Sequence, residues 1–317
     1  MPTPLKPRAL RPGDAIRVIA PSSPVEAERL EKGIAEFERL GFVVHRDPRI
    51  LSRDGYFAGS VADRVKEFLA DVGEKETRAV ICARGGYGSN YLLDELLGEV
   101  DYVKEMSPPK MLIGHSDVTS LQVFLWEKCG WVTFYGPMVA AGFDAGEGSP
   151  RGYDKPSFEQ AISATTGGWT IKLEGETLAR GNAEGTVLGG CLTLVVATLG
   201  TPWAINTKGA ILALEDRAMK PWQVDRALMQ LKQAGKLDRA AGLLFGDFPE
   251  CEGPAGSANV REVVSRITRK FDVPVVWNVP FGHTERPMLT IPLGVRARLT
   301  ANASPTLEIL EAACSEG

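Results

Sequence analysis

The sequence predicts an α/β protein with two domains, a parallel-sheet domain followed by a smaller α+β domain. Three observations lead to this expectation. Short apolar runs alternate with helical patterns through the first half, a stretch rich in glycine, aspartate and proline follows, and the second half mixes strands and helices less regularly. The chain of 317 residues also exceeds the length of one average domain.

The first half has the alternation that is typical of a parallel sheet. Apolar runs predict strands at 15–21, 41–47, 78–83, 110–114 and 131–137, and helical patterns predict helices at 26–40, 60–70, 87–97 and 117–127. Strict alternation predicts a parallel sheet covered on both faces. Ligands bind outside the carboxyl ends of such strands, where the sequence has GGYG at 85–88 and GHSD at 114–117.

The pattern changes near the middle of the chain. Residues 141–156 are rich in Gly, Asp and Pro, and the stretch from 165 to 179 is polar and weakly periodic. We therefore expect an N-terminal domain at 1–155, a linker at 156–180 and a C-terminal domain at 181–317. The last domain has predicted helices at about 190–199, 222–234 and 258–270, and predicted strands at 209–215, 241–248, 273–279, 296–300 and 306–310. This mixture indicates an α+β or swivelling domain.

The composition argues against several classes of function. A net charge of −4 without Lys/Arg blocks argues against nucleic acid as the partner, because such a protein needs a clustered basic face. No apolar stretch approaches the roughly 18 residues of a membrane span, and prolines interrupt the N-terminus where a signal peptide is apolar. The five scattered cysteines contain no CxxC pair, which fits a reducing cytoplasm. Without HExxH or paired histidines, we expect neither a metal nor another cofactor.

Ser116 is the strongest candidate for a reactive side chain. In MLIGHSDVTSLQ an apolar strand runs into a helix without an intervening loop, so Ser116 occupies the turn. A serine there projects its hydroxyl above the sheet edge, and the helix N-terminus directs N–H groups at a reacting carbonyl. The pattern is related to the nucleophile elbow, although Val118 replaces the second glycine of G-x-S-x-G. The alternative is that Ser116 is an ordinary helix N-cap.

A nucleophilic serine needs a base, and the chain has three histidines. His115 adjoins Ser116 and leaves the backbone in another direction, while His45 is followed by charged residues and is expected at the surface. His283 remains, on a glycine-preceded turn in VPFGHTERPM. Glu215 ends the apolar strand GAILALE and is the candidate that orients the imidazole. The plainer alternatives are a satisfied loop histidine and a loop carboxylate or helix cap.

Glycines follow the third predicted strand in RAVICARGGYGS, at Gly85 and Gly86. Glycine lets the backbone approach a ligand closely and turn an N–H towards it. The alternatives are a phosphate-binding loop or a tight strand–helix turn. Because the segment lacks the full G-x-G-x-x-G spacing and a Walker lysine, it gives little support to a nucleotide site.

Ordered motifs along nearly the whole chain resemble the LD-carboxypeptidase family of serine peptidases. This family includes murein tetrapeptide carboxypeptidases and microcin C self-immunity peptidases. The motifs are RPGDAIRVIAPSSP, ICARGGYGSNYLLDEL, LIGHSDVTSLQ, FYGPM, GNAEGTVLGGCLTLVVATLGTPW, ILALEDRAMKPWQVDRALMQLKQAG, GLLFGDF and PFGHTERPMLTIPLG. Several motifs in order are far more specific than any one of them.

The resemblance implies a fold and a reaction. The family fold is an N-terminal flavodoxin-like sheet with a smaller C-terminal domain, assembled as a homodimer with the site between domains. The family's Ser–Glu–His triad corresponds to Ser116, Glu215 and His283, and its oxyanion donors correspond to the N–H groups of Gly86 and Asp117. The implied reaction releases the terminal D-alanine from a murein tetrapeptide through an acyl-enzyme, in cytoplasmic recycling of the cell wall.

The free carboxylate of such a substrate needs a cation. Arg84 is the nearest candidate in the sequence, and Gly85 follows it in the same loop. The chain departs from the family where His115 replaces a common aromatic residue, Cys191 a common asparagine and Lys220 a common acidic residue. The first and third departures bear on substrate recognition.

Three other functions remain open at this point. One is hydrolysis of an acyl-nucleotide such as an aminoacyl adenylate, although family members of that kind have longer chains with an added aromatic-bearing loop. Another is a non-catalytic α/β protein that binds a phosphate or carboxylate at GGYG. A glutamine amidotransferase-like protein would need a cysteine where this chain has Ser116.

Overall fold

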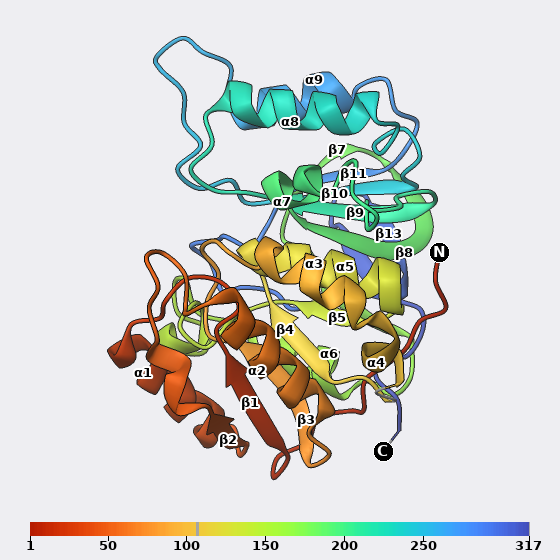
Figure 1. Ribbon diagram of the computed structural model, residues 1–317. Helices are drawn as coiled ribbons and strands as arrows, with labels where there is room; N and C mark the ends of the chain where they lie inside the picture. Colours follow the sequence, from red (N-terminus) through yellow and green to blue (C-terminus); the bar gives the residue numbers. More distant parts are fainter. Residues whose placement is uncertain (106–107, 317) are drawn as a thin grey trace.

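Five parallel strands form most of the first sheet in the computed structural model, which describes residues 1–105 and 108–316 (Figure 1). The strands are β1 (Ala15–Ile19), β2 (Val43–Arg46), β3 (Thr77–Cys82), β4 (Met111–Gly114) and β5 (Thr133–Tyr135). Their spatial order is β2-β1-β3-β4-β5, which is the flavodoxin-like order. The predicted parallel sheet is confirmed. A sixth strand, β12 (Ile291–Leu293), runs antiparallel beside β5.

Helices cover both faces of the first sheet. One face packs against α1 (Ala27–Arg39) and α6 (Lys155–Ser163), and the other against α2 (Val61–Gly73), α3 (Asn90–Gly98), α4 (Val100–Glu105) and α5 (Thr119–Phe124). Shorter 3₁₀ turns lie at Pro48–Leu51, Ser116–Val118 and Phe143–Ala145, and a π-helical turn lies at Leu125–Cys129. The apolar face predicted for α1 is confirmed, because Leu30, Ile34 and Phe37 are buried.

The second sheet is mixed, as the fold prediction requires. Its strands are β6 (Trp169–Lys172), β7 (Glu176–Ala179), β8 (Gly181–Cys191), β9 (Ala210–Glu215), β10 (Gly242–Gly246), β11 (Val275–Val279), β13 (Arg296–Ala301) and β14 (Thr306–Ile309). The order is β6-β14-β13-β8-β9-β10-β11-β7, with β8 to β11 parallel and the outer strands antiparallel. Helices α8 (Pro221–Gln233) and α9 (Val260–Thr268) cover its outer face, and α7 (Leu192–Ala197) packs between α8 and α5 (Figure 1).

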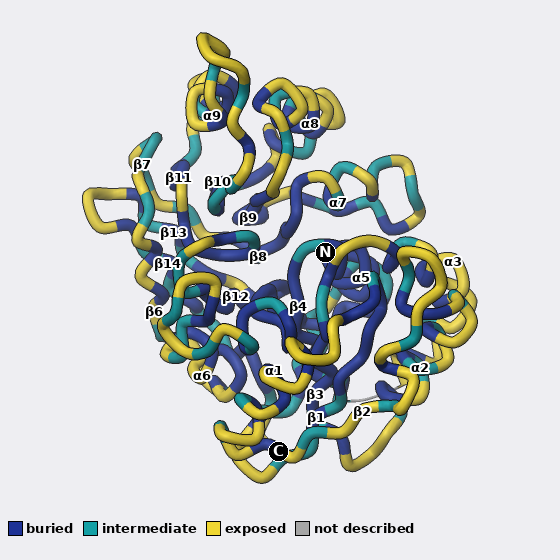
Figure 2. Tube along the Cα trace, turned by 90° about the vertical axis from the view of Figure 1, so that its left-hand side faces the viewer, coloured by how far each residue is buried: buried dark blue, intermediate teal, exposed yellow. Residues whose placement is uncertain are grey.

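The chain crosses between the two sheets more than once. The segment expected as a linker, 156–180, holds most of α6 together with β6 and β7, which form the two edges of the second sheet. Strand β12 joins the first sheet, although the residues around it lie in the predicted C-terminal domain. As a result, one apolar cluster is continuous from Ile16 of β1 to Ile211 of β9. Figure 2 shows this buried interior as dark blue strands running through both domains.

The domains meet closely beside the predicted site. Gly190 in β8 has φ +135°, and a Cβ on it would lie 2.6 Å from the Thr119 side chain of α5. The Thr119 hydroxyl accepts a hydrogen bond from the Cys191 N–H at 3.0 Å. Because a side chain at position 190 would separate these elements, glycine sets the approach of β8 to the first domain.

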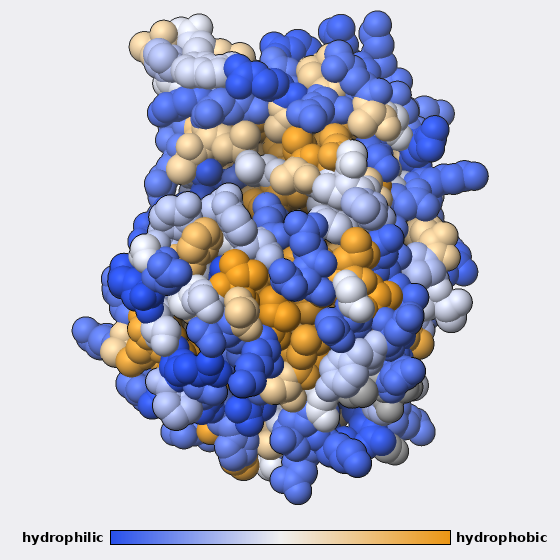
Figure 3. Space-filling view, in the orientation of Figure 1, coloured by the Kyte–Doolittle hydropathy of each residue, from blue (hydrophilic) through white to orange (hydrophobic). Residues whose placement is uncertain are grey.

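Hydrophilic side chains dominate the face shown in Figure 3, with an apolar area near its centre. A shallow groove lies along α2 there, lined by Val61, Val65, Leu69 and Tyr102 among others. In the described part of the chain, no helix combines the length and apolar character that a membrane span requires.

Candidate active site

Ser116 occupies a strained turn directly after β4. Its φ is +63°, in the left-handed region that residues other than glycine rarely adopt. The 3₁₀ turn that begins at Ser116 leads into α5, so the strand meets the helix without a loop, as the sequence predicts. The residue at the cap position is His115, and among the described residues the Ser116 hydroxyl makes no capping hydrogen bond. The left-handed φ and the missing capping bond fit a nucleophile elbow better than a helix cap.

The glycine loop after β3 lies against this serine. A Cβ on Gly85 would lie 2.7 Å from Ser116 Cβ and 2.9 Å from its Oγ, so only glycine permits the contact. The N–H groups of Gly86 and Asp117 have no hydrogen-bond partner within the described residues. The N–H of Ser116 itself is engaged, because it donates to Tyr135 Oη at 3.2 Å. The geometry therefore fits oxyanion donors at Gly86 and Asp117 rather than at Ser116.

Buried polar side chains hold the glycine loop in place, and the sequence patterns did not predict this role for them. The Asp117 carboxylate accepts hydrogen bonds from Ser22 Oγ at 2.6 Å and from the Ser89 N–H at 2.8 Å. Arg64, which is 2% exposed, donates to the carbonyl of Gly88 at 2.9 Å. Asp117 stood out by its position beside Ser116, but Arg64 gives no signal because it lies within an ordinary amphipathic helix.

Glu215 and His283 form a hydrogen-bonded pair. Glu215 ends β9 and is fully buried, and one of its oxygens accepts from His283 Nδ1 at 2.8 Å and from the His283 N–H at 2.9 Å. The other oxygen accepts from Tyr135 Oη at 2.5 Å. Since a carboxylate only accepts, Nδ1 carries the proton and Nε2 of the neutral ring has a free lone pair.

The charges of this pair stabilise each other. Burial opposes protonation of His283, but the negative charge and hydrogen bond of Glu215 outweigh it and raise the pKa of His283 above its ordinary value. Burial also acts to raise the pKa of Glu215, but the charge of His283 and the hydrogen bonds from His283 and Tyr135 outweigh it and lower that pKa. The two shifts agree, because each favours the charged form of one partner.

The second histidine near the site behaves differently. His115 is buried, its Nδ1 donates to the carbonyl of Gly136 at 2.9 Å, and its ring lies edge-on to that of His283 with centroids 5.5 Å apart. Burial, and then the positive charge of His283, lower the pKa of His115 to about 4. His115 is therefore neutral at physiological pH, whereas His45 lies exposed on β2 as expected.

Ser116 and His283 line one cleft of about 340 Å³. Within the described structure they make no hydrogen bond with each other. Gly85, Gly86 and Arg84 also line this cleft, whereas Asp117 is buried beneath it. The sequence-predicted residues therefore converge, from β4, β9 and the loops after β3 and β11, on the boundary between the domains.

Arginines give the cleft a positive lining. Three of them pair with carboxylates, as Arg29 with Asp144, Arg151 with Glu285, and Arg217 with Glu250. Arg84 is half-buried, and it has no carboxylate partner among the residues that the structure describes. Burial lowers the pKa of Arg84 because its charge is poorly solvated. Across the same described residues, no three His, Cys, Asp or Glu side chains are grouped so as to hold a metal ion.

Comparison with known proteins accounts for this arrangement. Residues 16–136 match the LD-carboxypeptidase N-terminal domain, and residues 184–299 match the LD-carboxypeptidase C-terminal domain. A probable murein peptide carboxypeptidase of Bacillus subtilis is 34% identical over 315 residues, which cover 98% of this chain and 96% of that protein. The chain belongs to the LD-carboxypeptidase family. The match to both domain models and to carboxypeptidase relatives supports a peptidase, as the motifs suggested.

Solved structures of LD-carboxypeptidases share the two-domain architecture. Muramoyltetrapeptide carboxypeptidase from Oxalobacter formigenes superimposes with a TM-score of 0.82 at 29% identity, covering 94% of this chain and 99% of that chain. The microcin C7 self-immunity protein MccF superimposes with a TM-score of 0.88 at 25% identity, covering 98% and 100%. The protein of that name from Escherichia coli is 27% identical over 324 residues, which cover 92% of each chain. The predicted fold class is confirmed.

Proposed function

We propose that this LD-carboxypeptidase is a serine-type, metal-independent enzyme that releases the C-terminal D-alanine from murein tetrapeptides. The observation that carries the proposal is the buried Glu215–His283 pair, whose imidazole shares one cleft with the strained Ser116. A buried carboxylate that fixes the tautomer of a histidine beside an elbow serine is the arrangement of a hydrolytic triad. The murein peptide and muramoyltetrapeptide carboxypeptidases among its relatives support the substrate class.

The first half of the reaction is acylation. His283 Nε2 takes the proton of Ser116 Oγ while Oγ attacks the carbonyl carbon of the bond to D-alanine. The N–H groups of Gly86 and Asp117 donate to the resulting oxyanion, and one such donor contributes roughly 3–4 kcal/mol in other enzymes. His283 then gives the proton to the D-alanine nitrogen, the C–N bond breaks, and the remaining peptide stays bound to Ser116 as an ester.

The second half is hydrolysis of that ester. A water loses a proton to His283 and attacks the ester carbonyl, and the proton then passes to Ser116 Oγ as the C–O bond breaks. Glu215 remains ionised throughout and stabilises the imidazolium form of His283, as its lowered pKa favours.

Arg84 is the proposed partner of the substrate carboxylate. Arginine binds carboxylates through paired N–H donors, and in the described part of the cleft Arg84 is the arginine without an ion pair. The contact of Gly85 with Ser116 sets the backbone that carries this arginine close to the nucleophile. A carboxypeptidase needs such a cation near its nucleophile, since the scissile bond adjoins the terminal carboxylate.

The test is release of D-alanine from purified murein tetrapeptide by the Ser116→Ala variant. We expect a loss of at least about 1,000-fold in kcat with an unchanged melting temperature. The matched control is Ser120→Ala, because Ser120 is a buried serine on α5 whose hydroxyl has no hydrogen-bond partner within the described residues. Undiminished turnover in Ser116→Ala would overturn the proposal, as would loss of turnover on treatment with EDTA.

A second candidate is hydrolysis of an acyl-nucleotide. The observation that favours it is the structural similarity to MccF, which has been solved in complex with aspartyl sulfamoyl adenosine, with a TM-score of 0.88 at 25% identity. The two candidates share the acylation chemistry and differ in the leaving group. Parallel assays with tetrapeptide and with an aminoacyl sulfamoyl adenosine, compared by kcat/KM, decide between them.

The proposal includes a cytoplasmic homodimer. It is supported by the family resemblance and by the shallow apolar groove along α2, which a second copy could cover. Sedimentation equilibrium of the purified chain tests the assembly, with a mass of twice 34.2 kDa as the expected result.

A further inference from the structure

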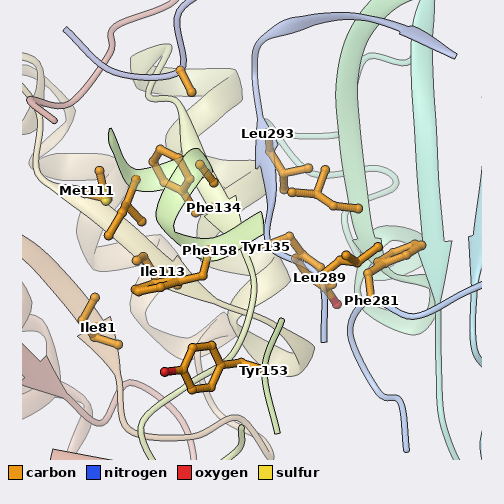
Figure 4. Close-up of a cluster of buried hydrophobic side chains, with 14 of the residues drawn as sticks. Ile81, Met111, Ile113, Phe134, Tyr135, Tyr153, Phe158, Phe281, Leu289 and Leu293 are labelled. Carbon is orange, nitrogen blue, oxygen red and sulfur yellow. The ribbon is translucent and has the colours of Figure 1, made fainter. Parts of the chain in front are cut away.

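Tyr135 lies between the nucleophile and the carboxylate. It is the last residue of β5, its backbone pairs with Gly114 just before the elbow, and its ring is 1% exposed. Figure 4 shows it at the boundary between the domains, beside Phe281 and Leu289. Its ring meets that of Phe281 edge-on with centroids 6.1 Å apart. The ring of His115 also lies edge-on to that of Tyr135, with centroids 6.2 Å apart, so these contacts fix the position of the hydroxyl.

The direction of each hydrogen bond at this hydroxyl is determined. Glu215 is ionised and can only accept, so the single proton of Tyr135 Oη points to Glu215 Oε1. The backbone N–H of Ser116 can only donate, so it points to a lone pair of the same oxygen. One buried hydroxyl thus connects the elbow of the first domain to the triad carboxylate of the second.

Both partners of Tyr135 need such support. Ser116 holds a φ of +63°, a conformation that persists only where surrounding contacts fix it. The Glu215 oxygen that faces Tyr135 receives no other protein hydrogen bond within the described residues, since both bonds from His283 go to the other oxygen. Without the phenol, the strained backbone loses an anchor and a buried anionic oxygen loses its donor.

We propose that Tyr135 is a positioning residue that sets the geometry of Ser116 and the basicity of His283 at once, an inference that rests on the proposed serine mechanism. Its phenol orients the nucleophile through the Ser116 N–H. It also withdraws charge from Glu215, so that the carboxylate attracts the proton of His283 less strongly than a free carboxylate would. Tyr135 itself is not among the residues that line the cleft.

The charged and titratable groups that face His283 and Tyr135 come from several elements. They are Tyr135 of β5, His115 of the β4 end, Cys191 of the β8 end, and Glu215, Asp216 and Arg217 of the β9 end and the loop after it. His115 is uncharged at neutral pH, and Asp216 is already held by Thr193. A change at Tyr135 therefore acts on His283 chiefly through Glu215.

The test replaces Tyr135 by phenylalanine, which keeps the ring and removes only the hydroxyl. We expect kcat to fall about 10- to 100-fold with KM within about twofold, because the lost bonds act on the reacting geometry and not on substrate binding. The acid limb of the kcat/KM profile should move to higher pH, because Glu215 without its donor holds the proton of His283 more tightly. A fall in activity without any shift of this limb would overturn the inference, as would unchanged kcat.

Tyr153→Phe is the matched control. Tyr153 is a fully buried tyrosine of the same apolar cluster, and its hydroxyl donates to Glu36 Oε1 at 2.6 Å, outside the cleft (Figure 4). The Tyr153→Phe variant therefore loses a tyrosine–carboxylate hydrogen bond of the same kind as the one that Tyr135→Phe loses. We expect its melting temperature to fall about as much as that of Tyr135→Phe, but its pH profile of kcat/KM to match that of the wild type.

A second replacement tests the inference if the Tyr135→Phe variant does not fold. Incorporation of 3-fluorotyrosine at position 135 keeps both hydrogen bonds and makes the phenol a stronger donor, so the acid limb should move to lower pH. No shift, or a shift in the same direction as for phenylalanine, contradicts the inference.

Labelling by a fluorophosphonate separates failure of this inference from failure of the proposed function. If the wild type labels at Ser116 but releases no D-alanine, the substrate proposal fails, and the pH profile of the labelling rate still tests Tyr135. If the wild type neither labels nor releases D-alanine, both fail. If the wild type does both and Tyr135→Phe matches it at every pH, only the role of Tyr135 fails.

Discussion

Gly282 leaves Glu215 the space that a side chain at position 282 would fill. A Cβ on Gly282 would lie 2.3 Å from Glu215 Cδ and 2.7 Å from its Oε1, and the glycine has a φ of +69°. The turn before His283 therefore wraps around the carboxylate, and the N–H and the imidazole of His283 reach the same oxygen. The glycine in FGH is a steric requirement of the pair.

Gly282→Ala is expected to damage catalysis more than folding. The added methyl group must displace Glu215 or the turn that carries His283, and a displacement of about 1 Å at such a site costs about 100-fold in rate. The control is Gly209→Ala, because Gly209 has the same φ of +69° but no heavy atom within 4 Å of the position that a Cβ would take. In both variants the free energy of unfolding should fall by about 1–2 kcal/mol, because alanine tolerates the left-handed conformation less well than glycine. Equal kcat values for the two would contradict the steric explanation.

Gly85→Ala tests the contact between the glycine loop and the nucleophile. Its Cβ would lie 2.7 Å from Ser116 Cβ, so we expect the loop to retreat and kcat to fall by about 100-fold. Gly98→Ala at the end of α3 is the control, since nothing lies within 4 Å of that position and alanine favours a helix. Both variants are compared by kcat and by the rate of fluorophosphonate labelling. A fall in both quantities for Gly98→Ala would show that they respond to general destabilisation and not to the contact between Gly85 and Ser116.

The pH dependence of kcat/KM should follow His283. The imidazole must be neutral to act as a base, and Glu215 raises its pKa above the ordinary 6.5, so activity should rise with pH through a midpoint above 6.5. Glu215→Gln removes the charge that raises this pKa and should move the midpoint downward. A midpoint that does not move in this variant would show that another group controls the acid limb.

Glu215 and His283 also make the free energy of unfolding depend on pH, and their contributions change with pH in opposite directions. Glu215 has a lowered pKa, so its contribution is present above 4.5 and is lost as the pH falls through the lowered value. His283 has a raised pKa, so its contribution is full below 6.5 and is lost as the pH rises through the raised value. The free energy of unfolding that depends on the pair should therefore be greatest between about pH 4.5 and 6.5. Urea unfolding of wild type and Glu215→Gln across this range measures it.

Arg84→Ala should weaken recognition of the substrate carboxylate. We expect KM to rise about 10- to 100-fold for a tetrapeptide with a free terminus and to change little for its C-terminal amide. Arg29→Ala is the control within the same cleft, because Arg29 is already paired with Asp144. The prediction fails if the amide and the free acid respond equally.

The sequence could predict elements whose pattern is local. Strands β3 and β4 are almost wholly buried, so they appear as apolar runs, and α1 carries its apolar residues at helical spacing. Strands β6 and β7 lie at the edges of the second sheet and keep exposed polar side chains, which is why the region was expected to be a linker. Strand β12 has three residues, one of them proline, and its partner lies far away in the sequence.

At the site, too, features that depend on local sequence could be predicted, whereas features that depend on contacts between distant segments could not. Glu215 ends an apolar strand, and Ser116 and His283 each come shortly after one, so their positions near strand ends could be predicted without knowing how the domains meet. Tyr135 could not be found in this way, because an aromatic residue at the end of a short strand is an ordinary core residue. Its two hydrogen bonds exist only once Ser116 and Glu215 have been brought together by the tertiary structure.

The return of β12 to the first sheet has a consequence for synthesis of the chain. Until residue 293 has left the ribosome, the β5 edge of the N-terminal sheet lacks its neighbour, and an open edge of this kind can pair with other chains. Strand β12 also follows His283 by only a few residues, so its docking restrains the loop that carries the histidine. A nascent chain therefore cannot complete its first sheet from the N-terminal half alone, and the loop that carries His283 becomes fixed only after β12 has paired with β5.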